Sequence, residues 1–144
     1  MYNIRKMTPC DKEQVLAMMR SFYASPAVLT DGSEEIFCRD IDTCIQGSPY
    51  LEGYVFEGKD GLLGYAMVAK SFSTEFGKPC IWIEDLYIES SYRGQGLGSR
   101  FLRQLEGQYP DSIFRLEVEE ENERAIRVYE TCGFRHLPYM EMKK

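Results

Sequence analysis

The sequence predicts a mixed α/β fold built on one central sheet. Apolar residues recur with a period of two in some stretches and near 3.6 in others, and these stretches follow the order β, α, α, β, β, β, α, β, α, β. The strand, helix and strand after the middle of the chain need a right-handed crossover. We therefore expect a parallel pair at the centre of an otherwise antiparallel sheet, flanked by about four helices.

The first third of the chain is predicted to contain one strand and two helices. Residues 2–7 alternate as an edge or near-edge strand, and the acid three residues after Thr8 is typical of a helix start. That helix ends near Pro26, because proline disfavours helical backbone in the residue before it. Ser33 is the expected cap of the second helix, which ends before Gly47.

Three antiparallel strands are expected in the middle of the chain. Residues 50–57 and 62–72 are the first two strands, joined through an Asp60-Gly61 step that is common in hairpins. The chain turns again near Gly77, and the central strand starts at Cys80.

A glycine-rich turn follows the central strand and leads directly into a helix. Gly94, Gly96 and Gly98 fall within five residues at this helix start, where they leave the first backbone N–H groups open. These groups, the helix dipole and the guanidinium of Arg93 suit a pyrophosphate. The G-x-G-x-G spacing differs from the dinucleotide motif, and no Gly-Lys-Ser/Thr follows to make a P-loop.

The last third of the chain is predicted to hold two strands and one helix. Gly107 and Pro110 are stop signals for the helix after the glycine turn. Residues 113–118 form the next strand, Asn122 caps a helix, and residues 134–142 give a last short strand.

Two motifs in this part of the chain resemble signatures of the GNAT N-acetyltransferase superfamily. The R-x-x-G-x-G run from Arg93 resembles the family's acetyl-coenzyme A pyrophosphate motif. The N-x-x-A-x-x-x-Y-x-x-x-G-F run from Asn122 looks like its second signature. Glu84-Asp85-Leu86 is similar to the same stretch in spermidine/spermine N-acetyltransferases. The motifs cover residues 84–134, and the order of elements matches the GNAT fold from end to end.

The resemblance implies acetyl-coenzyme A as co-substrate, with no metal. In the family, the central strand and the next one splay apart and the pantetheine arm lies between them, bonded to backbone groups. The residues expected to bind the coenzyme are Leu86, Tyr87, Ile88, Arg93, Gly94, Gln95, Gly96, Leu97, Gly98, Ser99, Asn122 and Tyr129.

The resemblance also implies catalytic roles for two residues. An alkyl ammonium has a pKa of roughly 10, so a base is expected to free the attacking lone pair. The glutamate that matches Glu84 is the base in spermidine/spermine N-acetyltransferases, and strand alternation would place Glu84 on the side of Leu86, toward the splay. Asp85 faces the other way unless a bulge reverses the order. Tyr129 matches the tyrosine that protonates the departing thiolate.

The net charge of the chain limits the classes of partner that it is expected to bind. Seventeen basic and 23 acidic residues give a net charge of −6, which argues against nucleic acid or an anionic membrane. By resemblance, the loop at residues 24–32 shapes the substrate site, and Asp31, Glu34 and Glu35 lie in or beside it. With Glu84 and Asp85 as substrate contacts, we expect a small cationic amine as acceptor.

Length and composition suggest a single domain over residues 1–144. The chain has no apolar run of membrane-spanning length and no apolar segment like that of a signal peptide at its start, so we expect a cytoplasmic protein. The five scattered cysteines and one histidine do not suggest a zinc site. For the assembly, we expect a homodimer. Two alternatives stay open: a GNAT-fold module that senses an acyl-coenzyme A without turnover, and an interaction domain without coenzyme.

Overall fold

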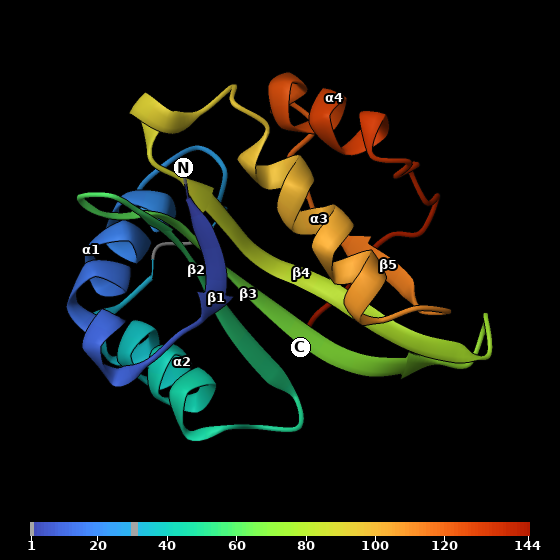
Figure 1. The fold of residues 1–144 in the computed structure, drawn as a ribbon. Helices are drawn as coiled ribbons and strands as arrows, with labels where there is room; N and C mark the ends of the chain where they lie inside the picture. The colour runs from blue at the N-terminus through green and yellow to red at the C-terminus, as the bar shows by residue number, and fades with distance from the viewer. Residues whose placement is uncertain (1, 30–31) are drawn as a thin grey trace.

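The computed structural model describes residues 2–29 and 32–144 and contains a five-stranded sheet with helices on both faces (Figure 1). The strands are β1 (Asn3–Lys6), β2 (Leu51–Gly58), β3 (Gly61–Ser73), β4 (Lys78–Ile88) and β5 (Ile113–Leu116). The helices are α1 (Lys12–Tyr23), α2 (Glu34–Gln46), α3 (Leu97–Gln108) and α4 (Glu123–Thr131), with short 3-10 turns η1 (Pro9–Asp11) and η2 (Ser90–Tyr92).

The strands lie in the sheet in chain order. The first four pair antiparallel, and β4 pairs parallel with β5 after the crossover through α3. The parallel ladder joins Cys80 through Ile83 to Ile113 through Leu116 and stops there. The second half of β4 therefore pairs with β3 on one side only, which is the predicted splay.

Each face of the sheet has its own apolar core. On one face, α1 and α2 bury Val15, Met19 and Ile41 completely against the sheet. On the other face, α3 contributes an apolar stripe to the core, as the periodicity predicted. Leu97, Phe101, Leu102 and Leu105 form this stripe, and each is at most 2% exposed.

Two of the predicted helix caps are present. The Ser33 hydroxyl accepts a hydrogen bond from the Ile36 N–H at 3.2 Å at the start of α2. The Asn122 side chain accepts one from the Ala125 N–H at 3.3 Å at the start of α4. Each side chain satisfies an N–H that the helix itself leaves unbonded.

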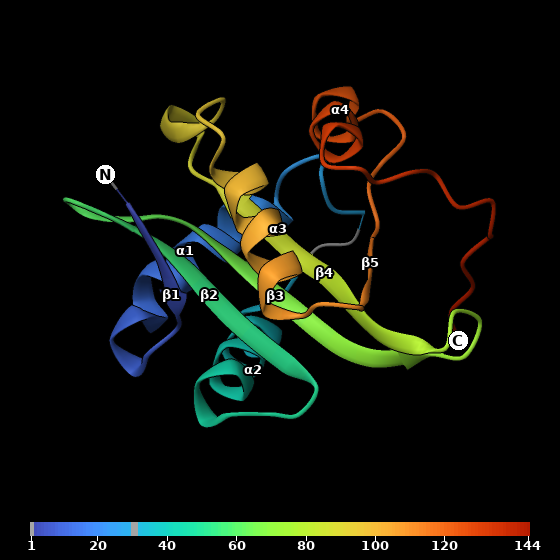
Figure 2. The ribbon, with the colours of Figure 1, turned by 45° about the vertical axis from the view of Figure 1, so that its right-hand side comes forward.

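Two predictions about the C-terminal end are wrong. Residues 134–142 form no strand, because Pro138 lacks an N–H and most of this segment is exposed. The segment crosses instead to the turn between β3 and β4, where the Tyr139 hydroxyl donates a hydrogen bond to Glu75 at 2.6 Å (Figure 2). Without that last strand, β5 is an edge strand, so the parallel pair lies at the edge of the sheet and not at its centre.

Candidate functional site

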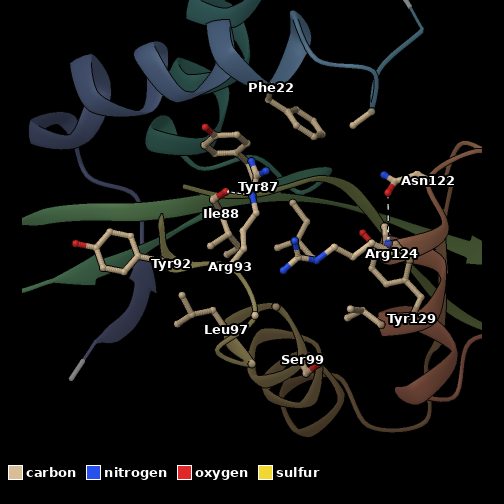
Figure 3. A pocket seen from close by; sticks show the side chains of 17 residues that line it. Phe22, Tyr87, Ile88, Tyr92, Arg93, Leu97, Ser99, Asn122, Arg124 and Tyr129 are labelled. Atoms are coloured by element: carbon tan, nitrogen blue, oxygen red, sulfur yellow. Dashed lines mark hydrogen bonds between the residues drawn. The ribbon is translucent and has the colours of Figure 1, made fainter. Parts of the chain in front are cut away.

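A cavity of about 300 Å³ opens where β4 and β5 separate (Figure 3). Its walls come from the free half of β4, the glycine loop, the start of α3 and one side of α4. The predicted coenzyme residues that line it are Leu86, Tyr87, Ile88, Arg93, Gly94, Gly96, Leu97, Gly98, Ser99, Asn122 and Tyr129. Gln95, Glu84 and Asp85 are not among the lining residues.

The glycine loop has the backbone geometry of an anion cradle. Gly94 and Gly96 have φ angles of 80° and 81°, a region that side chains disfavour. Gly96 is the residue before the first turn of α3, so the open N–H groups of that turn lie at the cavity wall. The turn that the sequence predicted is thus at the mouth of the splay.

Arg93 contacts the strand as well as the cavity. Its Nε donates a hydrogen bond to the Ile88 carbonyl at 2.7 Å, and its guanidinium carbon lies 5.5 Å from the centre of the Tyr87 ring. These two contacts hold the side chain along the free edge of β4. The hydrogen bond also satisfies the Ile88 carbonyl, which lies at the end of that edge, where the ladder with β5 does not reach.

Arg124 is a cavity residue that the sequence reasoning missed. It lies in the first turn of α4, and Figure 3 shows its guanidinium pointing into the cavity, toward the Arg93 side chain. A Cβ atom added to Gly94 would be 3.3 Å from an Arg124 terminal nitrogen. Neither arginine forms an ion pair within the described part of the chain. Two guanidiniums in one cavity favour a ligand with several negative charges.

Tyr129 and Asn122 both reach the cavity from α4. The Tyr129 ring packs edge-on against Phe134, with ring centres 5.9 Å apart. Burial raises the pKa of the Tyr129 phenol, with a further contribution from Cys132. The phenol therefore keeps its proton at neutral pH and can serve as a proton donor.

A β-bulge lies at Glu84 and interrupts the alternation of side chains along β4. The prediction that Glu84 points to the same side as Leu86 depended on that alternation. Met67 pairs with Asp85 and Val68 pairs with Ile83, so Glu84 has no partner on β3. Glu84 is exposed, in contrast to its neighbours on β4. Although solvent reaches the side chain, protein atoms around it partly desolvate the carboxylate, and this effect, with Glu141 and then Asp40 nearby, raises the pKa of Glu84.

Asp85 is buried on the α1/α2 face, at 4% exposure. Its carboxylate accepts hydrogen bonds from the Tyr65 hydroxyl at 2.7 Å and the Tyr23 hydroxyl at 3.1 Å. Burial raises the pKa of Asp85 to about 6, although these two hydrogen bonds favour the charged form. Asp85 can therefore change its protonation state close to physiological pH. Its hydrogen bond with Tyr23 also connects β4 to the end of α1.

Further carboxyl groups lie near this end of the splay. Burial raises the pKa of Asp40 on α2. A side-chain hydrogen bond with Glu141 is the main cause that raises the pKa of Glu117 to about 7, and Glu84 contributes to the same shift. Several carboxyl groups lie close together here, and a bound cation would reduce the repulsion between their ionised forms.

The loop before α2 contributes less charge than the sequence suggested. Asp31 lies outside the described residues. Glu34 accepts a hydrogen bond from Arg20 Nε at 2.9 Å, and Glu35 pairs with Arg39 at 3.2 Å, so both acids are offset by neighbours. Ala125 also lines the cavity; it is the alanine of the second motif, to which the sequence analysis gave no site role. The remaining lining residues that the sequence did not predict are ordinary core or loop types with no distinguishing signal: Phe22, Ala27, Tyr92 and Val128.

A sequence model described as "Acetyltransferase (GNAT) family" matches residues 16–134. Thialysine N-epsilon-acetyltransferase of Sus scrofa is 36% identical over 83 residues, which is 56% of this chain and 48% of that protein. Spermine/spermidine N(1)-acetyltransferase of Bacillus subtilis (strain 168) is 28% identical over 108 residues, covering 71% and 68% of the two chains. This chain thus spans about half the length of the first relative.

Solved structures of low sequence identity share the fold. A possible acetyltransferase from Clostridium difficile 630 superposes with a TM-score of 0.81 at 15% identity, over 99% of this chain and 96% of that one. Aminoglycoside N-acetyltransferase AAC(6')-Iy, solved in complex with CoA, gives a TM-score of 0.79 at 14% identity, over 100% and 94%. The comparison confirms the predicted α/β architecture.

Proposed function

The chain belongs to the acetyltransferase (GNAT) family, and from that premise we propose that it transfers the acetyl group of acetyl-coenzyme A to a primary amine. The observation that carries this proposal is the cavity at the splayed strands, which the glycine loop and the second motif both line. The proposed catalytic unit is the single domain of residues 1–144, which works by direct attack of the amine in a ternary complex.

The cavity provides the groups that such a coenzyme needs. The N–H groups at the start of α3, with Arg93 and Arg124, suit its phosphates. The free edge from Leu86 to Ile88 offers backbone groups to the amides of the pantetheine arm. One of these N–H groups would also stabilise the oxyanion that forms on the acetyl carbonyl.

The proposed chemistry needs one base and one acid. The amine nitrogen attacks the acetyl carbonyl carbon, the carbon–sulfur bond breaks, and the thiolate takes the proton of Tyr129. The attacking nitrogen gives up its extra proton as it becomes an amide, and this proton returns to the Tyr129 phenolate directly or through water. We assign Glu84 as the base that removes the ammonium proton, directly or through water, because it is the exposed carboxylate next to the free edge. Asp85 is the second candidate, acting through the Tyr23 hydroxyl that it binds.

We propose a small cationic amine as the acceptor. The pKa values of Asp40, Glu84 and Asp85 are all raised, mainly by burial, and their ionised forms would be stabilised by a bound cation. The B. subtilis relative is named for spermine and spermidine, which are cationic amines.

The proposal includes a cytoplasmic homodimer without a nucleic-acid or membrane partner. No helix among residues 2–29 and 32–144 is long and apolar enough to cross a membrane. Sedimentation at several protein concentrations tests the homodimer.

The deciding experiment measures free thiol release from acetyl-coenzyme A with a panel of amines: a polyamine, an aminoglycoside, a neutral arylamine and an N-terminal peptide. We expect release with the cationic amines at rates that fall as salt is added. Tight acetyl-coenzyme A binding without thiol release from any amine would instead identify a non-catalytic sensor of GNAT fold.

A further inference from the structure

Three side chains from separate elements form a hydrogen-bond network beside the free edge of β4. One carboxylate oxygen of Asp85 accepts a hydrogen bond from the Tyr65 hydroxyl of β3, and the other accepts one from the Tyr23 hydroxyl of α1. Tyr65 and Asp85 are buried, whereas Tyr23 is half-buried. A ligand can therefore reach the network through Tyr23.

Packing fixes the Tyr23 ring at the end of α1. Its centre lies 5.0 Å from that of the Phe37 ring on α2 and 5.5 Å from that of the Phe22 ring. The backbone of Gly32 is also close, because a Cβ atom added there would be 3.3 Å from Cδ1 of the Tyr23 ring. These contacts hold the ring, and Asp85 holds the hydroxyl, so the phenol is pre-organised for a ligand.

The network adjoins the cavity at the splayed strands. Phe22 precedes Tyr23 in α1, Leu86 follows Asp85 in β4, and both Phe22 and Leu86 line the cavity. Figure 3 shows Phe22 pointing from α1 toward the cavity. The proposed phosphate site is the glycine loop beyond Ile88, so a pantetheine arm along the free edge would bring the thioester toward Leu86. The network is therefore placed at the end where the amine must approach.

The direction of the hydrogen bonds determines what Tyr23 can offer to an amine. A phenol has one O–H to donate and lone pairs with which to accept. Asp85 takes the proton of Tyr23, so the oxygen remains available as an acceptor. An amine that donates one N–H to this oxygen can direct its own lone pair at the acetyl carbonyl once it is deprotonated.

We propose that the Tyr23 hydroxyl binds the attacking amine by accepting one of its N–H groups, and that Asp85 and Tyr65 are positioning residues that hold this hydroxyl in the accepting orientation. The inference rests on the proposed function and names the residues that orient the acceptor, while Glu84 keeps its role as the base. Protonation of Asp85 disrupts the arrangement, because a carboxylic acid donates from one of its oxygens and cannot accept from both phenols in the same way.

Acceptor binding should consequently depend on the ionisation of Asp85. Its pKa is about 6, mainly because burial raises it, and the hydrogen bonds from the two phenols oppose that shift. The titratable groups around Asp85 come from four elements: Tyr23 on α1, Asp40 and Cys44 on α2, Tyr65 on β3 and Glu84 on β4. Burial raises the pKa of Cys44 to about 12, so this thiol stays neutral over the pH range of interest.

The test measures thiol release between pH 5.5 and pH 8.5 with spermidine, or with another amine of the panel if that amine reacts faster. Tyr65→Phe removes one hydrogen bond that favours charged Asp85, so the pKa of Asp85 should rise by about one unit. The kcat/KM of this variant relative to wild type should then be close to 1 at pH 8.5 and about 0.1 at pH 5.5. The ratio cancels the protonation of the amine itself.

Tyr23→Phe removes the proposed amine contact and should lower kcat/KM for the amine about tenfold at pH 8.5. Tyr54→Phe is the matched control, because the Tyr54 hydroxyl also donates to a carboxylate, that of Glu52 at 2.8 Å, but lies in the core of the other face. Its kcat/KM relative to wild type should be the same at both pH values. A titration with acetyl-coenzyme A should give an unchanged dissociation constant in all three variants, which also shows that they are folded.

The outcomes separate this inference from the proposed function. Full kcat/KM in Tyr23→Phe would overturn the amine contact and leave the acetyltransferase in place. A Tyr65→Phe ratio that is equal at both pH values would overturn the positioning role. If Tyr65→Phe does not fold, the half-buried Tyr23 still decides the amine contact through its own variant. No thiol release by wild type with any amine of the panel would overturn the proposed function, and this inference with it.

Discussion

Tyr129 is a half-buried phenol in the cavity wall, and no described residue accepts a hydrogen bond from it. We predict that Tyr129→Phe lowers kcat about 100-fold, the usual contribution of a general acid, because the thiolate leaves without a proton. The dissociation constant of acetyl-coenzyme A should hardly change, since the ring and its packing against Phe134 remain. Single-turnover rates and a binding titration check both parts. Full turnover in the variant would show that the tyrosine only packs.

Glu84 and Asp85 can be separated by pH. Glu84→Gln should depress kcat/KM most at lower pH, where the acceptor is most fully protonated and help in removing its proton matters most. Asp85→Asn should instead remove an inflection near the pKa of about 6 that burial gives this carboxyl. The measurement is the pH profile of kcat/KM for each variant. An unchanged profile in Glu84→Gln, with loss of rate in Asp85→Asn, would move the base to Asp85.

Arg124 is expected to bind the coenzyme phosphates together with Arg93. Arg124→Gln and Arg93→Ala should each raise the dissociation constant of acetyl-coenzyme A by a factor of about ten or more, the effect of losing one charge-assisted contact. Arg127→Gln, exposed on the same helix, is the control. Calorimetry with acetyl-coenzyme A and with acetyl-pantetheine, which lacks phosphates, checks the assignment. A loss that is equal for both ligands would place Arg124 outside the phosphate site.

At the scale of elements, the strongest local patterns predicted the structure well. The stripe on α3 was predictable because Leu97, Phe101 and Leu105 recur at helical spacing and are all buried. The glycine turn was predictable because positive φ angles at Gly94 and Gly96 demand this residue type. Local chemistry determines each of these features, so the sequence of one segment is sufficient to predict it.

Features that depend on distant segments could not be predicted. The bulge at Glu84 depends on the register between β3 and β4, which no residue of β4 determines alone. Arg124 lies beside the glycine loop only because α3 and α4 pack on the same face of the sheet, and it occupies a variable position of its motif. The C-terminal segment alternates well enough for a strand, but Pro138 and the hydrogen bond from Tyr139 to Glu75 take it elsewhere.

At the scale of the whole molecule, Glu52 joins several elements. Its carboxylate accepts hydrogen bonds from Lys6 at 2.9 Å, Lys70 at 3.2 Å and Tyr54 at 2.8 Å, and from the Tyr109 hydroxyl that follows α3. Burial alone would raise the pKa of Glu52, but the hydrogen bonds outweigh it and lower the pKa from 4.5 to about 2. The ionised carboxylate therefore stabilises the fold.

We predict that Glu52→Gln lowers the free energy of unfolding by roughly 2 to 3 kcal/mol at pH 7. Because the folded-state pKa is depressed, this contribution is present above pH 4.5 and is lost as the pH falls toward 2. Urea unfolding at pH 7 and pH 3 measures the difference. Glu106→Gln, exposed on α3, should show a small effect at both values. A destabilisation that does not shrink at pH 3 would show that packing, and not charge, is the cause.

The ladder between β4 and β5 stops at Ile83 and Leu116, and this sets a contrast in hydrogen exchange along one strand. Backbone amides of Cys80 to Ile83 are covered on both sides, so they should exchange with deuterium slowly, near the rate of global unfolding. Amides of residues 84–88 that point away from β3 should exchange within seconds to minutes in the free protein, because no strand covers them. A coenzyme that takes the place of the missing strand would slow that second group alone, and the exchange pattern would then map the pantetheine arm residue by residue.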